Sequence, residues 1–291
     1  MGTVGCFDVV TGEFLWMRNE TALPDFTLPT GVLTFASAGM KQEHVLLDAR
    51  TGNVRAPHRL SADAIGSLGD HAKLAAFMDD RSLVLVSQRR SISILDTLRC
   101  ELKAVTTASA PICALAADRG GFAVATSAGT VHAHTSRGEP SWRKESKLAL
   151  VGAVDGRLLL HDEEERVIRA VSLATGEEDR GLLEDVGSGW LALLATAGVV
   201  AVRMSDRIIA LDRLTLETRW ERAIRVDSGV ATTADAILEA SDGTVTALDP
   251  TTGKELSFVE TGAPRNNGML LSGGKIVLPP FGPELGVIVV D

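Results

Sequence analysis

The sharpest candidate for chemistry in the sequence is the pair His132 and His134, which are separated by one residue. On a β-strand, two residues at this spacing point to the same face, as two ligands of a metal ion would. His134, however, falls at the position that Leu248 takes in another copy of the repeat described below, and that position is expected to face a core. We therefore predict packed or hydrogen-bonded histidines rather than metal ligands. The other histidines are isolated in the sequence: His44, His58, His71 and His161.

Residue patterns typical of other enzymes are missing from the sequence. The chain contains no tyrosine, which excludes the Tyr nucleophile of a sialidase. No Gly-x-Ser-x-Gly segment occurs, so no nucleophile elbow is predicted. The segments Gly187-Ser188-Gly189 and Gly273-Gly274 precede no expected helix, and we interpret them as turns rather than phosphate-binding loops. Neither a disulfide framework nor a zinc site is indicated by the spacing of the cysteines, which are Cys6, Cys100 and Cys113. No catalytic, cofactor-binding or metal-binding residue is assigned, and no cofactor is predicted.

The charge balance bears on possible partners. The formal net charge is −9, whereas proteins that bind nucleic acid usually carry a basic patch. We therefore expect no nucleic-acid partner. The acidic run Asp162–Glu165 falls at a predicted turn, and we interpret it as a solvated loop rather than a docking site.

No apolar run approaches the ~18 residues needed to cross a membrane, so no membrane insertion is predicted. The segment Met1–Val10 has neither a basic region nor an apolar stretch typical of a secretory signal. We therefore expect a cytoplasmic protein, or a periplasmic one if a leader has been removed.

The strongest pattern is an internal repeat. In its clearest copy, Gly243–Leu256, a short apolar run ends at Asp249, a four-residue turn ends at Gly253, and a second run follows. A period near ~40 residues is typical of one four-stranded propeller blade. Copies in register follow one another along the chain and are anchored at Asp8, Asp48, Asp96, Thr135, Ser172, Asp212 and Asp249.

The Asp and Gly of the repeat have a structural explanation. An Asp side chain accepts hydrogen bonds from backbone amides two residues further on, which forms an Asx turn. A Gly adopts the positive φ that a hairpin with a bulge needs. We therefore predict that these residues build turns rather than a ring of carboxylates around a ligand.

The strand pattern predicts an all-β fold. Each repeat contains two further apolar runs, for example Ile112–Ala116 and Phe122–Thr126 before Thr130–His134, and we find no amphipathic helix. The chain begins with the second half of a blade, Val4–Val9 and Glu13–Met17. It ends with the first part of one, in the segments Gly268–Leu271, Lys275–Pro279 and Val287–Asp291.

Joining the two ends completes a propeller without exposed edges. We therefore predict a seven-bladed β-propeller of four-stranded antiparallel blades, closed by pairing of the N- and C-terminal strands. Eight blades are the less favoured alternative. Residues 1–291 are expected to form a single monomeric domain, or one domain of a larger protein.

Two copies of the repeat resemble a known family. Asp8–Trp16 and Leu248–Leu256 are similar to the pyrroloquinoline-quinone-type propeller repeat, which follows the pattern Ala-x-Asp-x-x-x-Gly-x-x-x-Trp. In that family the Trp docks against the neighbouring blade. Trp16 fits this position, whereas Trp220 follows a turn without Gly and Trp142 follows a shorter turn. Trp190 lies outside the motif, so the resemblance implies largely aliphatic packing between blades.

The family contains quinone-dependent dehydrogenases and non-catalytic members, including a scaffold lipoprotein of outer-membrane protein assembly. The dehydrogenases are longer and eight-bladed, with an adjacent cysteine pair, a calcium site and a catalytic Asp. Because no two cysteines are adjacent here, the resemblance favours a non-catalytic protein-interaction or scaffold module with a protein partner. The alternative is a quinone-dependent dehydrogenase-like enzyme or a small-ligand sensor that uses the central funnel. The candidate binding segments are Val54–Asp70 and Phe258–Asn267.

Overall fold

The computed structural model describes most of the chain. The described residues are 2–7, 14–28, 31–38, 41–48, 51–61, 74–79, 81–87, 89–97, 99, 101–145, 148–184, 186, 192–196, 198–226, 228–233, 235–241, 244–260, 270–272, 275–278 and 286–288. These residues form two compact units, Met1–Gly181 and Leu182–Asp291, here called the N-terminal and C-terminal units. The single-domain organisation stays a prediction.

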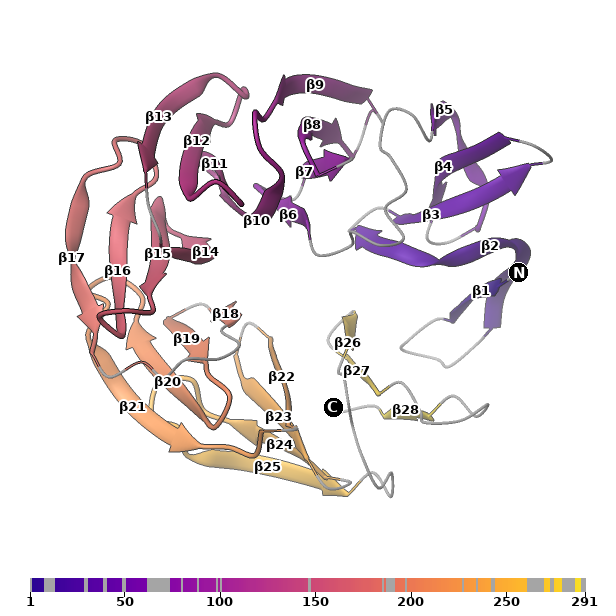
Figure 1. Ribbon diagram of the computed structural model, residues 1–291. Coiled ribbons are helices and arrows are strands. Elements are labelled where there is room, and N and C mark those ends of the chain that lie inside the picture. Colours follow the sequence, from indigo (N-terminus) through magenta and orange to yellow (C-terminus); the bar gives the residue numbers. More distant parts are fainter. Residues whose placement is uncertain are drawn as a thin grey trace. The chain divides into compact units, whose positions relative to one another are not determined.

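The described part of the chain contains strands and no α-helix. Five sheets have four strands each, joined in chain order (Figure 1). In the N-terminal unit these are β6 (Ala75–Phe77), β7 (Ser82–Ser87), β8 (Ser91–Asp96) and β9 (Glu101–Thr107); β10 (Ile112–Asp118), β11 (Gly121–Thr126), β12 (Thr130–Thr135) and β13 (Pro140–Glu145); and β14 (Ala149–Val154), β15 (Arg157–Asp162), β16 (Val167–Ser172) and β17 (Glu178–Leu183), whose last two residues pass the unit boundary.

The C-terminal unit repeats the arrangement. Its four-stranded sheets are β18 (Ala192–Ala195), β19 (Val199–Arg203), β20 (Arg207–Asp212) and β21 (Thr218–Ala223), followed by β22 (Gly229–Thr232), β23 (Ile237–Ser241), β24 (Thr244–Leu248) and β25 (Glu255–Glu260). A three-stranded sheet follows, with β26 (Leu270–Ser272), β27 (Lys275–Leu278) and β28 (Gly286–Ile288). The predicted all-β fold of four-stranded antiparallel sheets is therefore confirmed for five sheets. The number of blades and the closure by the chain ends stay predictions.

The N-terminal sheet differs from the expected pattern. It has five strands: β1 (Gly2–Phe7), β2 (Phe14–Leu28), β3 (Gly31–Ala38), β4 (Lys41–Asp48) and β5 (Val54–Ser61). The sequence predicted a strand ending at Met17, whereas β2 continues and pairs first with β1 and then, from Thr21 onward, with β3. Pro24 lies within β2 between two register shifts, since a proline has no N–H to donate to a regular ladder.

Burial follows the order of strands within a sheet. All six residues of β11 and all five of β19 are buried, whereas β9, β13 and β21 are mostly exposed. Strands covered on both faces need near-continuous apolar runs, which is the pattern that the sequence shows in the middle of each repeat. First strands of successive sheets contact one another within each unit, β10 with β6 and β14, and β22 with β18 and β26.

The cores between sheets are mainly aliphatic, as predicted. One cluster joins the sheets β6–β9 and β10–β13 through residues such as Val84, Ile92 and Phe122. A second joins β10–β13 to β14–β17 through Val131, Leu158 and Val171, and a third lies in the C-terminal unit.

The turns of the repeat have the predicted chemistry. Asp249 Oδ1 accepts hydrogen bonds from the amides of Thr251 (2.7 Å) and Thr252 (2.8 Å). Gly253 has φ +68° and donates its amide to Asp249 O at 2.8 Å. The bonds from the Thr252 and Thr251 amides lower the pKa of the Asp249 carboxyl. The carboxylate is therefore a structural acceptor inside its own turn.

The turn after Asp212 shows what happens without glycine. Asp212 Oδ1 accepts hydrogen bonds from the amides of Leu214 and Thr215, each at 2.8 Å. Leu216 takes the position of the glycine at φ 59°, a conformation that costs an L-residue about 1–2 kcal/mol. Its side chain is only 2% exposed, so apolar burial offsets that cost.

The tryptophans of two sheets dock on the turn of the next sheet. Trp142 Nε1 donates a hydrogen bond to Leu173 O at 2.9 Å, and Trp220 Nε1 donates one to Pro250 O at 2.7 Å. A Cβ at Gly176 would lie 2.8 Å from Trp142 Cδ2, and one at Gly253 would lie 2.7 Å from Trp220 Cδ2. Docking is thus confirmed for Trp142 and Trp220, and the turn glycine is needed for space as well as for its φ.

We expect Gly176→Ala and Gly253→Ala to lower the free energy of unfolding by about 2–4 kcal/mol each, because left-handed strain and a clash with the indole add together. Gly156→Ala is the matched control. Gly156 also has a positive φ, +74°, but nothing lies within 4 Å of an added Cβ, so only the strain of about 1 kcal/mol is expected. Urea unfolding measures all three; equal losses in the three variants would contradict the indole contact.

Candidate functional site

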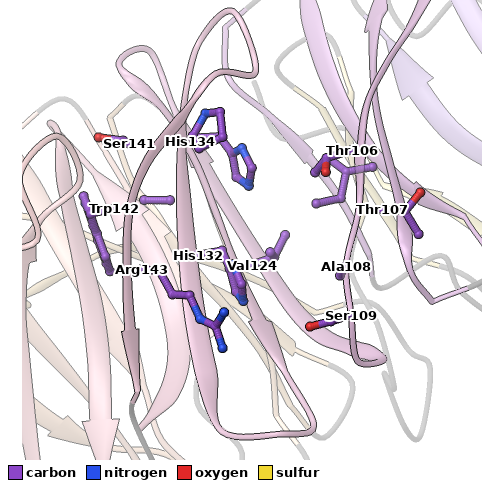
Figure 2. A pocket seen from close by; sticks show the side chains of 13 residues that line it. Thr106, Thr107, Ala108, Ser109, Val124, His132, His134, Ser141, Trp142 and Arg143 are labelled. Atoms are coloured by element: carbon purple, nitrogen blue, oxygen red, sulfur yellow. The ribbon is translucent and has the colours of Figure 1, made fainter.

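A cleft of about 440 Å³ lies within the N-terminal unit, between the sheets β6–β9 and β10–β13. Figure 2 shows His132, His134 and Arg143 on one side and Thr106 and Thr107 on the other, with Ser109 on the segment that follows β9. The residues that line the cleft are Ile92, Thr106, Thr107, Ala108, Ser109, Val124, His132, Ala133, His134, Pro140, Ser141, Trp142 and Arg143.

The cleft lies where the sheet contact differs from those made by Trp142 and Trp220. The neighbour of the turn glycine is here Val105, because a Cβ at Gly138 would lie 2.8 Å from Val105 Cγ2. The isopropyl group of valine is much smaller than the indole side chain of tryptophan, so less of the space between the sheets is filled. In the sheet β10–β13, His134 takes the position that Leu248 has in the sheet β22–β25.

His134 is a packed histidine, as predicted. It is 5% exposed, and its ring stacks on Phe122 with the centroids 4.8 Å apart. Its Nδ1 lies 3.4 Å from Gly138 O. Burial lowers the pKa of the His134 imidazole, the bond to Gly138 raises it, and nearby His132 lowers it again.

His132 is half-buried and ends a chain of hydroxyl contacts. Its Nε2 lies 3.0 Å from Thr130 Oγ1, which lies 2.7 Å from Thr126 Oγ1. Arg143 is its partner in the register between β12 and β13. Burial lowers the pKa of the His132 imidazole, and the Arg143 guanidinium lowers it further.

The charge of Arg143 has no counter-charge in the cleft. No carboxylate is among the lining residues, and no ion pair joins Arg143 to the residues that the structure describes. Arg169, on the third strand of the next sheet, at the position that His132 has in β12, lies instead among carboxylates. Its guanidinium bonds Glu178 Oε1 at 2.7 Å and also pairs with Glu165 and Asp162. The cleft therefore carries a cation that no described residue neutralises through an ion pair.

His132 and His134 do not form a metal centre with other described residues. Within the described ranges, no group of three or more His, Cys, Asp or Glu side chains is placed to hold an ion. Cys113 is a free, exposed thiol whose Sγ lies 3.3 Å from Ala125 O. None of the described segments forms a helix that is long and apolar enough to span a membrane.

Of the remaining candidates from the sequence, the acidic run and His161 are described by the structure, and the others are not. Asp162 Oδ1 accepts the amides of Glu164 and Glu165 at 3.1 and 3.0 Å, so the acidic run is a solvent-exposed turn, as predicted. His161 is buried, and its Nε2 has no hydrogen-bond partner among the described residues. The following lie outside the described residues or side chains: Trp16, Trp190, His44, His58, His71, Cys6, Cys100, Gly187-Ser188-Gly189 and Gly273-Gly274.

Sequence reasoning missed most of the cleft. Arg143, Thr106, Thr107 and Ser109 carry no motif, and they meet only through the register of β12 with β13 and the packing of two sheets. One pattern in the sequence pointed to the cleft. His134 aligns with Leu248 in the repeat, so a polar ring takes a position that is otherwise apolar.

The fold matches known propellers. A computationally designed protein, Ika8, is 16% identical with a TM-score of 0.63, and the match covers 95% of this chain and 87% of that one. BamB from Moraxella catarrhalis is 18% identical with a TM-score of 0.57, covering 96% and 86%. A chain of the Mitotic Checkpoint Complex is 11% identical with a TM-score of 0.53, covering 72% and 70%. The docked tryptophans, the Asx turns and these similarities define a β-propeller protein with PQQ-like repeats.

The family follows from the sequence match. A family model described as outer membrane protein assembly factor BamB matches residues 97–281, and the chain belongs to this family. The resemblance to the pyrroloquinoline-quinone-type repeat is thereby confirmed. No curated protein sequence matches the chain.

We expect His134→Leu to weaken the loss of stability in acid. Because the folded state disfavours the charged imidazole, the unfolded chain takes up a proton more readily below its usual pKa of about 6.5. The free energy of unfolding therefore falls as the pH drops through that value, and this contribution is absent from the variant. Urea unfolding at pH 7.5 and 5.5 measures the difference.

Val171→Ala is the control for this experiment, since Val171 is a buried core residue of the next sheet that does not titrate. It should lower stability equally at both pH values. An acid loss in His134→Leu as large as in the unchanged chain would contradict the role of the buried imidazole.

Proposed function

We propose that the chain is a non-catalytic scaffold that binds a protein partner. The match of residues 97–281 to the family of an assembly factor carries this proposal. The chemistry of the repeat supports it, because the recurring Asp and Gly residues are used in turns and indole docking. The most regular residues of the sequence thus serve the fold, which leaves recognition to side chains that vary between repeats.

The outer strand β25 offers a surface for such a partner. Leu256 and Phe258 are 58% and 61% exposed, and their spacing of two places both on one face of the strand. β25 is the last strand in the order of its sheet. Exposed apolar side chains on an outer strand favour protein contact. Phe258 also begins one of the two segments that the sequence singled out, Phe258–Asn267; residues 261–267 of it lie outside the described residues, as do 62–70 of Val54–Asp70.

We expect the purified chain to recover a stable protein partner from an extract of its source organism. The double variant Leu256→Ser, Phe258→Ser should reduce this recovery at least about tenfold, because truncating the anchor residues of an interface typically costs about 2 kcal/mol or more of binding free energy. Quantitative mass spectrometry after affinity capture, with cross-linking to map the contact, gives the readout.

Leu214→Ser is the matched control, because Leu214 is 79% exposed but lies in the turn after β20, away from β25 in the chain. It should leave recovery unchanged. Recovery of no partner would contradict the scaffold role, as would saturable binding of a quinone with dehydrogenase activity. Recovery that is unaffected by the double variant would retain a scaffold but exclude β25 as its surface.

A further inference from the structure

The cleft between the sheets β6–β9 and β10–β13 concentrates hydrogen-bond donors without acceptor charges. Arg143 is exposed and has a guanidinium with five N–H donors, and it lies beside the His132 ring (Figure 2). The opposite side is lined by Thr106, Thr107 and Ser109, and the Ser109 hydroxyl points toward the side of Arg143 (Figure 2). This is unusual for a chain whose formal net charge is −9.

The floor of the same cleft is apolar. Ile92 and Val124 are each 1% exposed, and Ala133 is equally buried, yet all three line the cleft. A volume of about 440 Å³ falls in the range typical of small-molecule sites, which combine apolar walls with a few directed polar groups. The cleft is thus suited to a compact apolar body that carries one polar group.

An anion is the polar group that suits this cleft best. The Arg143 guanidinium would repel a cation and would give a neutral group no Coulomb attraction. An oxyanion, in contrast, accepts two parallel bonds from a guanidinium and a further one from the Ser109 hydroxyl. Arg169 on β16 gives the contrast, since there described residues of the protein itself supply the carboxylates, Glu178 at 2.7 Å among them.

We propose that this cleft binds a small organic oxyanion, a carboxylate or phosphate group on a compact apolar body. Arg143 and the hydroxyl of Ser109 bind the oxyanion, and Ile92 and Val124 contact the apolar part. The site is separate from the protein-binding surface proposed on β25, and small-molecule binding can be measured without any protein partner.

The test uses benzoate and phenyl phosphate as probes and benzamide as the neutral counterpart of benzoate. Calorimetric titration of the full chain should show one saturable site for at least one oxyanion, filled below about 10 mM, and at least about tenfold weaker binding of benzamide. Binding of one probe alone identifies its oxyanion as the preferred one. In NMR spectra the ring signals of His132 and His134 should shift during the titration, while those of His161 should not.

Two pairs of variants locate the site. Arg143→Met keeps most of the stem but removes the charge, and should weaken oxyanion binding about tenfold or more. Arg119→Met, at an exposed turn outside the cleft, should leave it unchanged. Ser109→Glu places a carboxylate in the cleft and should abolish binding, whereas Thr218→Glu, on the exposed start of β21, should not. Thermal melts establish that each variant is folded.

Three results would overturn the proposal. These are the absence of saturable binding by both oxyanions, equal affinity for benzamide and benzoate, and unchanged affinity in folded Arg143→Met and Ser109→Glu. None of them bears on the recovery of a protein partner, so failure of this proposal and failure of the scaffold role are distinguishable.

Discussion

The contact between an indole of one sheet and a glycine in the turn of the next fixes how successive sheets pack. At Gly176 and Gly253 a Cβ would lie less than 3 Å from the indole of Trp142 or Trp220. The indole N–H donates to a carbonyl of the same turn, Leu173 O or Pro250 O. One residue pair thereby sets both the distance and the orientation between sheets. The side chain that begins each turn makes this possible, because Asp249 accepts the amides of Thr251 and Thr252, and Ser172 Oγ accepts the amide of Thr175, and these bonds hold the glycine toward the ring.

The same constraint bears on the cleft between the sheets β6–β9 and β10–β13. At Gly138 the neighbouring side chain is Val105 instead of an indole. In the same region, His134 takes a position of the repeat that is otherwise apolar. The stack of His134 on Phe122 fills part of the space, and the remainder is the cleft. A departure from the repeat thus lies next to the cleft between the sheets β6–β9 and β10–β13. In repeat proteins, irregular positions are therefore the places to look for specific binding, since the regular ones are occupied by packing.

Much of the fold could be predicted because its signals are local. The Asp–Gly turn and the apolar runs lie within a few residues of each other, and five four-stranded sheets follow them closely. The N-terminal sheet was predicted less well, since nothing near Met17 signals that β2 continues to Leu28. The cleft could not be predicted at all from motifs. Arg143 and Thr107 come from different sheets, and their proximity depends on strand register and on the size of Val105, which a single sequence does not display. Only His134 gave a hint, through its alignment with Leu248.

The chain-order pairing of the strands has a consequence for how this protein folds. Within each sheet, the described strands pair in chain order. The docking bonds reach only 31 positions ahead, from Trp142 to Leu173, or 30, from Trp220 to Pro250. Short loops close at a small entropic cost, and local contacts favour rapid folding. Each sheet can therefore form while later parts of the chain are still being synthesised. An indole can dock as soon as the next repeat, which contains its glycine, has left the ribosome.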